Sequence, residues 1–522
     1  MSIHATSSYS GSVPAVQVDS AGNIYACGHF RSKNGSWDVD PNPAVTNNLN
    51  VSGLHSSVIS KYNPSGNLLW YLVVEADNDD RVLDCALNAA GTHLAVSGTF
   101  EGNMNFPDGA AAIASAGDTD AYVALIATDT STGTTAPSGV LWGKTLGGVG
   151  LDAATGVGFG SSNEVYVGGH FKDNTGGTVD INWGVGSADN RTSAGHEDSF
   201  LTKFAVDGSL EWSKTWGGTS NDFLHDLAID GNDIYVGGYL ANQASDYDPG
   251  SGEELIGGTS GGQGGQDSWI SKFNPSGDLQ WVKSFGSSSN DMIKGIAATG
   301  GNVYATGWQL GAGGDWDTGS GTIVIGSSHY EPFTIKLNSS GVTQWVFAVD
   351  TEEGAGPPTG ESLAVDGSGN VYTAGTYRAT ADLGSGSGVA DFTANRGTVK
   401  DEVFLLKHNS SGVHQWAKVF PSYGNAYPHG LTTLGSDVYM SGYFSDWMDF
   451  DPSAGDATIR SAGSSDGYVA KYTSAGVLAA GNAPLVANPP SGFQVVHGPV
   501  DGAELQGYEA EVVLATPLCA GG

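Results

Sequence analysis

The chain has 522 residues, including 80 glycines, and carries 55 acidic against 20 basic side chains, a formal net charge of −35. So negative a chain disfavours nucleic acid and anionic membranes as partners, because like charges repel. No run of about 18 apolar residues occurs, so no membrane span is expected. Abundant glycine and frequent turn signals predict many short strands rather than helices.

The N-terminal part of the chain shows no targeting signal. Residues 1–12 form an N-terminal segment that lacks the basic and apolar regions of a secretory leader, so no Sec signal peptide is expected. Cys27, Cys85 and Cys519 do not make a disulfide framework. Cys27 and Cys85 lie in apolar, strand-like runs, and we interpret them as two small buried hydrophobic residues.

A strand pattern that ends in a glycine recurs along the chain, as in the segment Asp233–Leu240. Aligning its copies places that glycine at Gly28, Gly98, Gly169, Gly238, Gly307, Gly375 and Gly442. Successive copies are 67 to 71 residues apart. Such a regular period is the signature of a repeat architecture.

A lysine, a turn glycine and a tryptophan form a second recurring mark, as in Lys272, Gly277 and Trp281. The tryptophans are Trp70, Trp142, Trp212, Trp281, Trp345 and Trp416, with an insertion at 129–137 ahead of the second. We expect each to pack over a glycine between neighbouring sheets. Their predicted role is therefore structural.

Each repeat contains four strand signals separated by turn residues, for example at 225–230, 233–240, 268–273 and 279–285. A four-stranded sheet cannot bury both faces alone, so its copies must stack, and a closed ring leaves few exposed edges. We predict an all-β fold, a single seven-bladed β-propeller of four-stranded antiparallel blades with a repeat of about 69 residues, over residues 13–481. Residues 482–522 form a C-terminal tail, interpreted as a docking, self-association or anchoring segment.

The unit Asp198–Leu240 resembles the bacterial β-propeller repeats called SBBP repeats. It has the Asp-started strand with its lysine, a turn before Trp212, a Gly-Gly pair, and the Gly-Asn turn into the tyrosine strand. The resemblance extends from about Val13 to Gly481. It implies an extracellular or envelope-associated propeller, usually with no assigned chemistry.

Binding residues are expected on the face that carries the long loops, among them 172–197, 241–266 and 379–400. Asp80, Asp152, Asp222 and Asp291 occupy matching positions in successive repeats there, whereas Pro358 and Ala426 take the place in later ones. Clustered carboxylates near a channel mouth are candidate ligands for a hard cation. The alternative is that each aspartate caps its own turn.

Four Asp-x-Asp segments are candidate calcium sites: Asp38 with Asp40, Asp246 with Asp248, Asp315 with Asp317, and Asp449 with Asp451. They resemble the start of a calcium loop but lack its distant glutamate. The alternative is that strand alternation turns both carboxylates to water. No cofactor is certain, and calcium is the one candidate.

The main functional prediction is a non-enzymatic scaffold, extracellular or surface-associated, that binds protein or glycan through the long-loop face. We expect no enzyme, because catalytic residues normally occur once in a chain, whereas the acidic positions here recur from repeat to repeat, and no known catalytic motif is present. Two alternatives stay open. One is a structural component of a virus particle or another extracellular assembly, joined through the tail. The other is a carbohydrate-active enzyme on a propeller.

Overall fold

The computed structural model describes residues 2–479, apart from 6–9, 32–35, 41–47, 51–53, 108–111, 129–138, 174–177, 242–243, 258–264, 288, 327, 352–357, 379, 385–390, 395–399, 454, 456 and 462–463. Met1–Asn488 is one compact unit, and a second unit is Pro489–Gly522. The insertion at 129–137, the tail at 482–522 and Cys519 lie outside the described residues.

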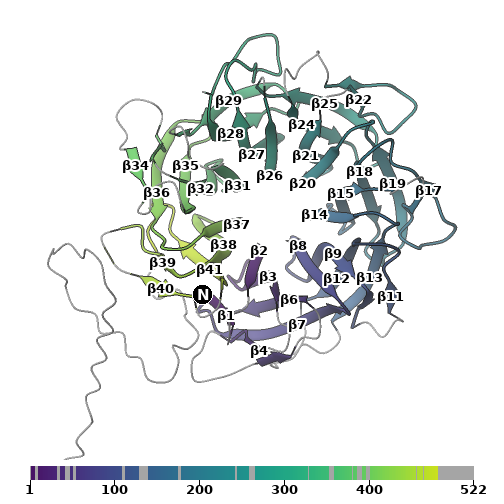
Figure 1. Ribbon diagram of the computed structural model, residues 1–522, viewed down its shortest axis with the longest axis horizontal. Coiled ribbons are helices and arrows are strands. Elements are labelled where there is room, and N and C mark those ends of the chain that lie inside the picture. The colour runs from purple at the N-terminus through teal and green to yellow at the C-terminus, as the bar shows by residue number, and fades with distance from the viewer. Residues whose placement is uncertain are drawn as a thin grey trace, which may run out of the picture. The chain divides into compact units, whose positions relative to one another are not determined.

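Antiparallel groups of four strands follow one another along the chain, and a parallel bridge between His55 and Asp79 joins the first two groups into one sheet. Within each group the strands run in chain order from the inner to the outer edge (Figure 1). The sheets begin with β2 (Gly11–Val18), β3 (Ile24–Arg31), β6 (His55–Tyr62) and β7 (Leu68–Ala76). Next come β8 (Asp79–Leu87), β9 (His93–Glu101), β12 (Asp120–Ala127) and β13 (Val140–Leu146). Then follow β14 (Ala153–Phe159), β15 (Val165–Phe171), β18 (Asp198–Phe204) and β19 (Leu210–Trp216).

The same order continues through the second half of the unit. The strands are β20 (Asp222–Asp230), β21 (Asp233–Ala241), β24 (Gln266–Phe273) and β25 (Leu279–Phe285), then β26 (Asp291–Thr299), β27 (Asn302–Leu310), β28 (Tyr330–Leu337) and β29 (Thr343–Ala348). After them come β31 (Thr359–Val365), β32 (Val371–Tyr377), β35 (Glu402–His408) and β36 (His414–Phe420), and finally β37 (Ala426–Leu434), β38 (Asp437–Phe444) and β41 (Asp466–Tyr472).

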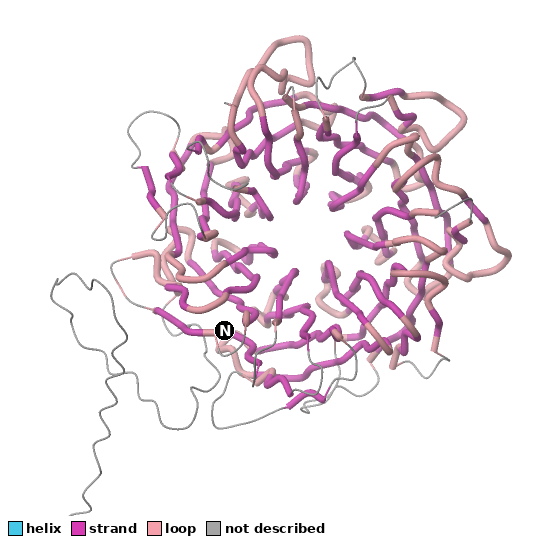
Figure 2. The backbone as a smooth tube through the Cα atoms, viewed as in Figure 1, coloured by secondary structure: helices cyan, strands magenta, loops and turns pink. Residues whose placement is uncertain are grey.

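Short strands occupy the connections between the long ones. They are β4 (Ser36–Asp38), β5 (Asn48–Asn50), β10 (Asn103–Asn105), β11 (Ile113–Ala114), β16 (Val179–Asp180), β17 (Asn190–Arg191), β22 (Ser245–Asp246), β23 (Leu255–Ile256), β30 (Asp350–Thr351), β33 (Thr380–Asp382), β34 (Asp391–Thr393), β39 (Trp447–Asp449) and β40 (Thr458–Arg460). Most pair as hairpins between the second and third strands of a sheet. The longer loops project outward from the sheets (Figure 2).

The sheets are arranged around a central opening, and β2, β8, β14, β20, β26, β31 and β37 are the strands nearest to it (Figure 1). The fold is therefore all-β and propeller-like. Hydrophobic side chains fill the spaces between neighbouring sheets, which is where most of the apolar surface is removed from water. The described residues contain no helix, so none of them forms a helix long and apolar enough to span a bilayer.

The N-terminal strand β1 (Ser2–Ala5) joins the last sheet. Ser2 is opposite Tyr468 and Ile3 is opposite Gly467 of β41, in antiparallel pairing. Strands from the two ends of the described chain thus share one sheet. Segment 1–12, which the sequence analysis kept apart from the propeller, is partly built into it.

Five of the six repeated tryptophans, all except Trp70, connect their sheet to the next by a hydrogen bond. The Nε1 of Trp142 donates to the carbonyl of Val206 at 2.9 Å, and Trp212, Trp281, Trp345 and Trp416 donate in the same way at 3.0 to 3.4 Å. The following turn glycine rests on the indole, since a Cβ on Gly208 would press against Trp142. This contact gives the repeated glycine and tryptophan a shared packing role.

Truncation of one of these tryptophans should destabilise the protein. Trp142 is only 7 % exposed and packs against Phe204 with 5.5 Å between ring centres. Trp142→Ala is expected to lower the free energy of unfolding by about 3–5 kcal/mol, because it leaves a cavity and an unpaired carbonyl. Urea denaturation of this variant measures the loss. A change no larger than that of Trp142→Phe would contradict the packing role.

The repeated lysine has a fold role as well. In six sheets a lysine of the third strand lies over a tyrosine ring of the second strand, with 4.9 to 5.5 Å between nitrogen and ring centre. The lysines are Lys61, Lys203, Lys272, Lys336, Lys407 and Lys471. This cation–π contact accounts for the recurring spacing between the two residues.

Cys27 and Cys85 form a disulfide, which corrects the prediction that they are unlinked hydrophobic residues. The bond joins β3 to β8, and therefore two neighbouring sheets, across a sequence separation of 58 residues. Both residues are buried, as expected from their apolar context. Strand patterns could not reveal that β3 and β8 place these two thiols side by side.

The disulfide should contribute measurably to stability. Replacing both cysteines by serine, or reducing them, is expected to lower the free energy of unfolding by about 2–4 kcal/mol, because the unfolded chain regains the freedom of a long loop. Denaturation with and without dithiothreitol measures this difference. Identical curves, with free thiols demonstrated in the native protein, would show that the bond is absent.

Candidate functional site

Each innermost strand has a β-bulge at the same point. On β20 the pairing with β21 jumps from Leu224 to Asp226, which leaves His225 as the extra residue. Equivalent register shifts occur on β2, β8, β14, β26, β31 and β37. The glycine used to align the repeats lies opposite the bulge. A Cβ on Gly238 would overlap the carbonyl oxygen of Phe223, so the close approach requires glycine.

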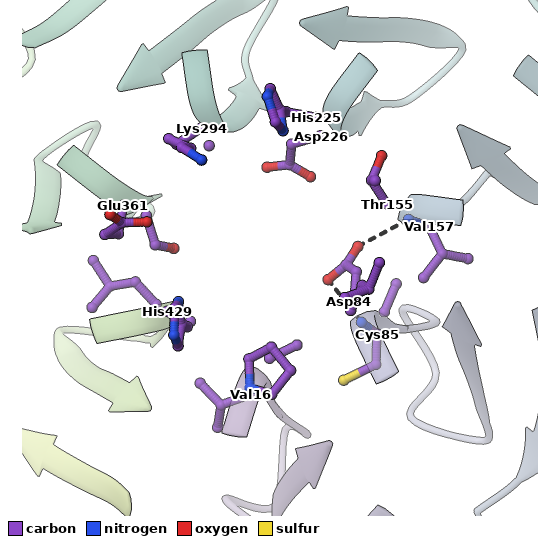
Figure 3. Close-up of a pocket in the computed structure, with 18 of the residues that line it drawn as sticks. Val16, Asp84, Cys85, Thr155, Val157, His225, Asp226, Lys294, Glu361 and His429 are labelled. Carbon is purple, nitrogen blue, oxygen red and sulfur yellow. Dashed lines mark hydrogen bonds between the residues drawn. The ribbon is translucent and has the colours of Figure 1, made fainter. Parts of the chain in front are cut away.

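The bulges bring chemically different residues to one central cavity of about 500 Å³ (Figure 3). The residues at this position are Pro14, Leu83, Thr155, His225, Lys294, Glu361 and His429, and all line the cavity. The framework positions repeat from sheet to sheet, whereas this position changes almost every time. The cavity therefore has the asymmetry that a chemical site requires.

Two aspartates follow the bulge and line the same cavity. The Asp84 Oδ2 accepts the N–H of Val157 at 2.9 Å, and the Asp226 Oδ2 accepts that of Ile296 at 2.8 Å, each from the next sheet. Burial raises the pKa of Asp84 to about 7. Burial, and then the charge of Asp84, raise the pKa of Asp226 well above its ordinary value. The pair therefore retains a proton near neutral pH.

Two histidines of the ring are held by aromatic neighbours. His225 packs beside the stacked rings of Phe223 and Tyr239, with ring centres 6.1 and 5.5 Å away. His429 packs in the same way beside the stacked rings of Tyr427 and Tyr443. Burial lowers the pKa of both histidines, so each is a neutral imidazole with one donor and one acceptor nitrogen at neutral pH.

Glu361 faces Asp84 and Asp226 across the cavity in the view of Figure 3, with Lys294 beside it. The Thr359 hydroxyl donates to Glu361 Oε1. Thr155 donates to the carbonyl of Leu224 at 2.8 Å, which links neighbouring inner strands. Glu361, the Asp84–Asp226 pair with its retained proton, and two neutral imidazoles thus surround one polar cavity.

The predicted loop-face aspartates lie at the start of the inner strands and do not belong to this lining. Asp80, Asp152, Asp222 and Asp291 are all buried. Each accepts a backbone N–H from the residue four positions earlier, at 2.5 to 2.9 Å. Asp222 also accepts the hydroxyl of Tyr247 at 3.0 Å. Each of these side chains is thus engaged by nearby backbone, that of Asp80 by Ala76 and Ser57 of the preceding sheet, and the four are not brought together.

The Asp-x-Asp segments lie in separate loops. Asp246 accepts the N–H groups of Asp248 and Glu254, and Asp315 and Asp449 make the corresponding bonds two and eight residues on. Asp38 accepts the N–H of Asp40 at 3.0 Å. Within the described ranges no three His, Cys, Asp or Glu side chains gather as metal ligands would. Calcium binding by these segments stays a prediction.

The sequence analysis missed the cavity residues, although a signal was present. Every bulge residue lies three positions after the aligned aspartate position, as His225 follows Asp222 and Glu361 follows Pro358. Comparing the repeats column by column reveals a position that is chemically variable within a constant framework. The motifs searched for were contiguous, whereas these residues are about 70 positions apart.

No protein-family model matches the chain, so the resemblance to SBBP repeats stays a prediction. Among curated proteins, the regulatory protein FlaEY of Caulobacter vibrioides is 25 % identical over 233 residues, which is 40 % of this chain and 20 % of that protein. The chain thus spans about a fifth of that relative's length.

The solved structures that are similar to the chain include carbohydrate-active enzymes. Polysaccharide lyase Uly1 has a TM-score of 0.39 at 8 % identity, with 88 % of this chain and 90 % of that chain covered. A PL25 ulvan lyase has a TM-score of 0.30 at 9 % identity, with 86 % and 84 % covered. The phage phi92 endosialidase has a TM-score of 0.31 at 11 % identity, with 95 % and 70 % covered. The prediction that the chain is not an enzyme is corrected to the extent that these similar structures are named as enzymes; at TM-scores of 0.30 to 0.39 they assign no activity to this chain.

Proposed function

We propose that the chain is a seven-bladed β-propeller enzyme that cleaves a polysaccharide by acid–base catalysis in its central cavity. The observation that carries this proposal is the ring of dissimilar bulge residues, Thr155, His225, Lys294, Glu361 and His429, with Asp84 and Asp226 beside them. A cavity of about 500 Å³ admits roughly one or two monosaccharide units.

The blade count rests on the strand order. Inner strands β2, β8, β14, β20, β26, β31 and β37 each begin one sheet, and β1 supplies the fourth strand of the last sheet. Joining the last sheet through the N-terminal strand closes the ring by hydrogen bonds. Closure fixes the distances across the cavity, as a preorganised site requires.

The reaction we propose is hydrolysis of a glycosidic bond. The proton held by the Asp226–Asp84 pair passes to the glycosidic oxygen, and the bond from the anomeric carbon to that oxygen breaks. Glu361, on the other side of the cavity, takes a proton from a water molecule while the oxygen of that water forms a bond to the anomeric carbon. The neutral imidazoles of His225 and His429 hydrogen-bond sugar hydroxyls and orient the ring.

The location we propose is outside the reducing cytosol, at the cell surface or beyond. The Cys27–Cys85 disulfide supports this, because such bonds persist in oxidising compartments. The glycan that the sequence analysis predicted as a binding partner becomes a substrate in this proposal.

The first test is a screen of the full chain against a panel of neutral, uronic and sulfated polysaccharides. Released reducing ends and falling viscosity are measured at pH 5 to 8. We expect turnover on at least one glycan. No turnover on a broad panel, by a protein with intact fold and disulfide, would exclude the proposal.

A further inference from the structure

The central cavity continues to the rim of the molecule through two neighbouring hollows. A second hollow of about 380 Å³ shares Ser12, His29 and Tyr443 with the cavity. A third, of about 420 Å³, shares Ser445 and Ser464 with the second. These shared walls define one groove, which we call the seam groove, along the junction of the first and last sheets.

Three cations of the described residues line this groove, two of them in the outer hollow together with Asp446, whereas Lys144, Lys214, Lys283 and Lys418 line none of the three hollows. Six lysines lie over tyrosine rings, and Arg81, Lys172, Arg191 and Arg378 pair with carboxylates. Lys294 lines the cavity, whereas Lys400 and Arg460 line the outer hollow. For these three, no carboxylate of the described residues lies within ion-pair distance. A chain of net charge −35 thus presents cations at both ends of one groove.

The outer end of the seam groove also exposes aromatic rings. Tyr423 is 54 % exposed and lines the outer hollow, and Trp447 is 39 % exposed. The backbone joins the two residues, since the N–H of Tyr423 donates to the carbonyl of Trp447 at 2.8 Å. The Arg460 guanidinium lies over the Trp447 ring at 5.6 Å, which fixes the charge beside the apolar surface. Flat rings beside a guanidinium suit the apolar face and acid group of a charged sugar.

We propose that the seam groove binds a linear anionic polysaccharide, with its acid groups at Lys400 and Arg460 on the rim and at Lys294 in the cavity. The inference rests on the proposed function, because it names the substrate class of the same site. Charge complementarity selects the occupant. On so acidic a protein, a polyanion is attracted to a place where several cations line one groove.

Affinity electrophoresis in native gels tests this inference without turnover. Gels contain dextran sulfate, polygalacturonate or uncharged dextran, and Glu361→Gln protein is run so that no polymer is cleaved. We expect retardation by an acidic polymer but not by dextran, weakening as salt rises. Adding Lys400→Gln and Arg460→Gln should weaken the binding about tenfold, because two charge-assisted contacts are lost. If only dextran sulfate retards the protein, the groove recognises sulfate groups, and if only polygalacturonate does so, it recognises carboxylate groups.

The matched control carries Lys172→Gln and Arg191→Gln, which remove the same charge from cations that line none of the three hollows. Equal weakening by both pairs, or equal retardation by dextran, overturns the inference. The proposed function fails separately. If the acidic polymer binds through the groove but the unmodified chain cleaves no glycan, only the proposed catalysis is rejected. If the chain cleaves a neutral glycan but does not bind acidic polymers, only the proposed role of the seam groove is rejected.

Discussion

Replacing Glu361 by glutamine is expected to reduce glycan cleavage by about two to four orders of magnitude, the usual contribution of a positioned general base. The substitution preserves shape and hydrogen bonding but removes the negative charge that would take the proton from water. Glu361 is only partly buried, and its one described partner is the Thr359 hydroxyl, so the fold should tolerate glutamine. The measurement is kcat and KM on the best substrate of the panel, with most of the loss in kcat.

Glu253→Gln is the matched control, because Glu253 is an exposed glutamate that does not line the cavity. It should retain full activity. Asp226→Asn should also inactivate the enzyme and remove the basic limb of its pH profile, since the raised pKa belongs to the proton donor. Full activity in Glu361→Gln would exclude Glu361 as the base.

Raising the pH from 6.5 to 9 is expected to destabilise the protein by an amount on the order of 5 kcal/mol, since one pKa unit corresponds to about 1.4 kcal/mol. Burial raises the pKa of several aspartates to about 7 or 8, namely Asp80, Asp84, Asp152, Asp198 and Asp291. In the unfolded chain such groups titrate near about 3.9. Between these pH values the folded state binds more protons, so stability is present at low pH and lost as pH rises through 7 to 8.

Histidines act in the opposite direction below about pH 6.5, the pKa of an unperturbed histidine. Burial lowers the pKa of His29 to about 3 and that of His170 to about 4, so folding is disfavoured once the unfolded histidines are charged. Stability should therefore peak in the mildly acidic range. Urea midpoints across pH 5 to 9 measure the curve, and Asp152→Asn should flatten its alkaline limb. A stability that is constant or rises from pH 6.5 to 9 contradicts this account.

The local structure followed from the sequence because it depends on short-range chemistry. Turn glycines such as Gly277, the strand around Tyr235 and the tryptophan Trp281 are each specified by neighbours within a few residues. The period of 67 to 71 residues then predicted repeated antiparallel sheets. The all-β, propeller-like arrangement is confirmed, because identical sheets must cover one another's apolar faces.

The cavity was decided by tertiary structure. His225, Lys294 and Glu361 are each unremarkable within their own repeat, and only a bulge at the same point of successive inner strands turns them toward one axis. The sequence showed that glycine recurs at the aligned position, but it did not show why glycine is needed there. The structure gives the reason, because the bulge places a carbonyl directly over Gly238. The Cys27–Cys85 bond and the pairing of β1 with β41 likewise join segments that only the ring brings together. The sequence alone was enough to define the repeating unit, because strands and turns depend on residues that are close together in the chain. Which non-repeating residues meet in the cavity depends on the packing of the sheets around the central opening, because only this packing brings distant residues together.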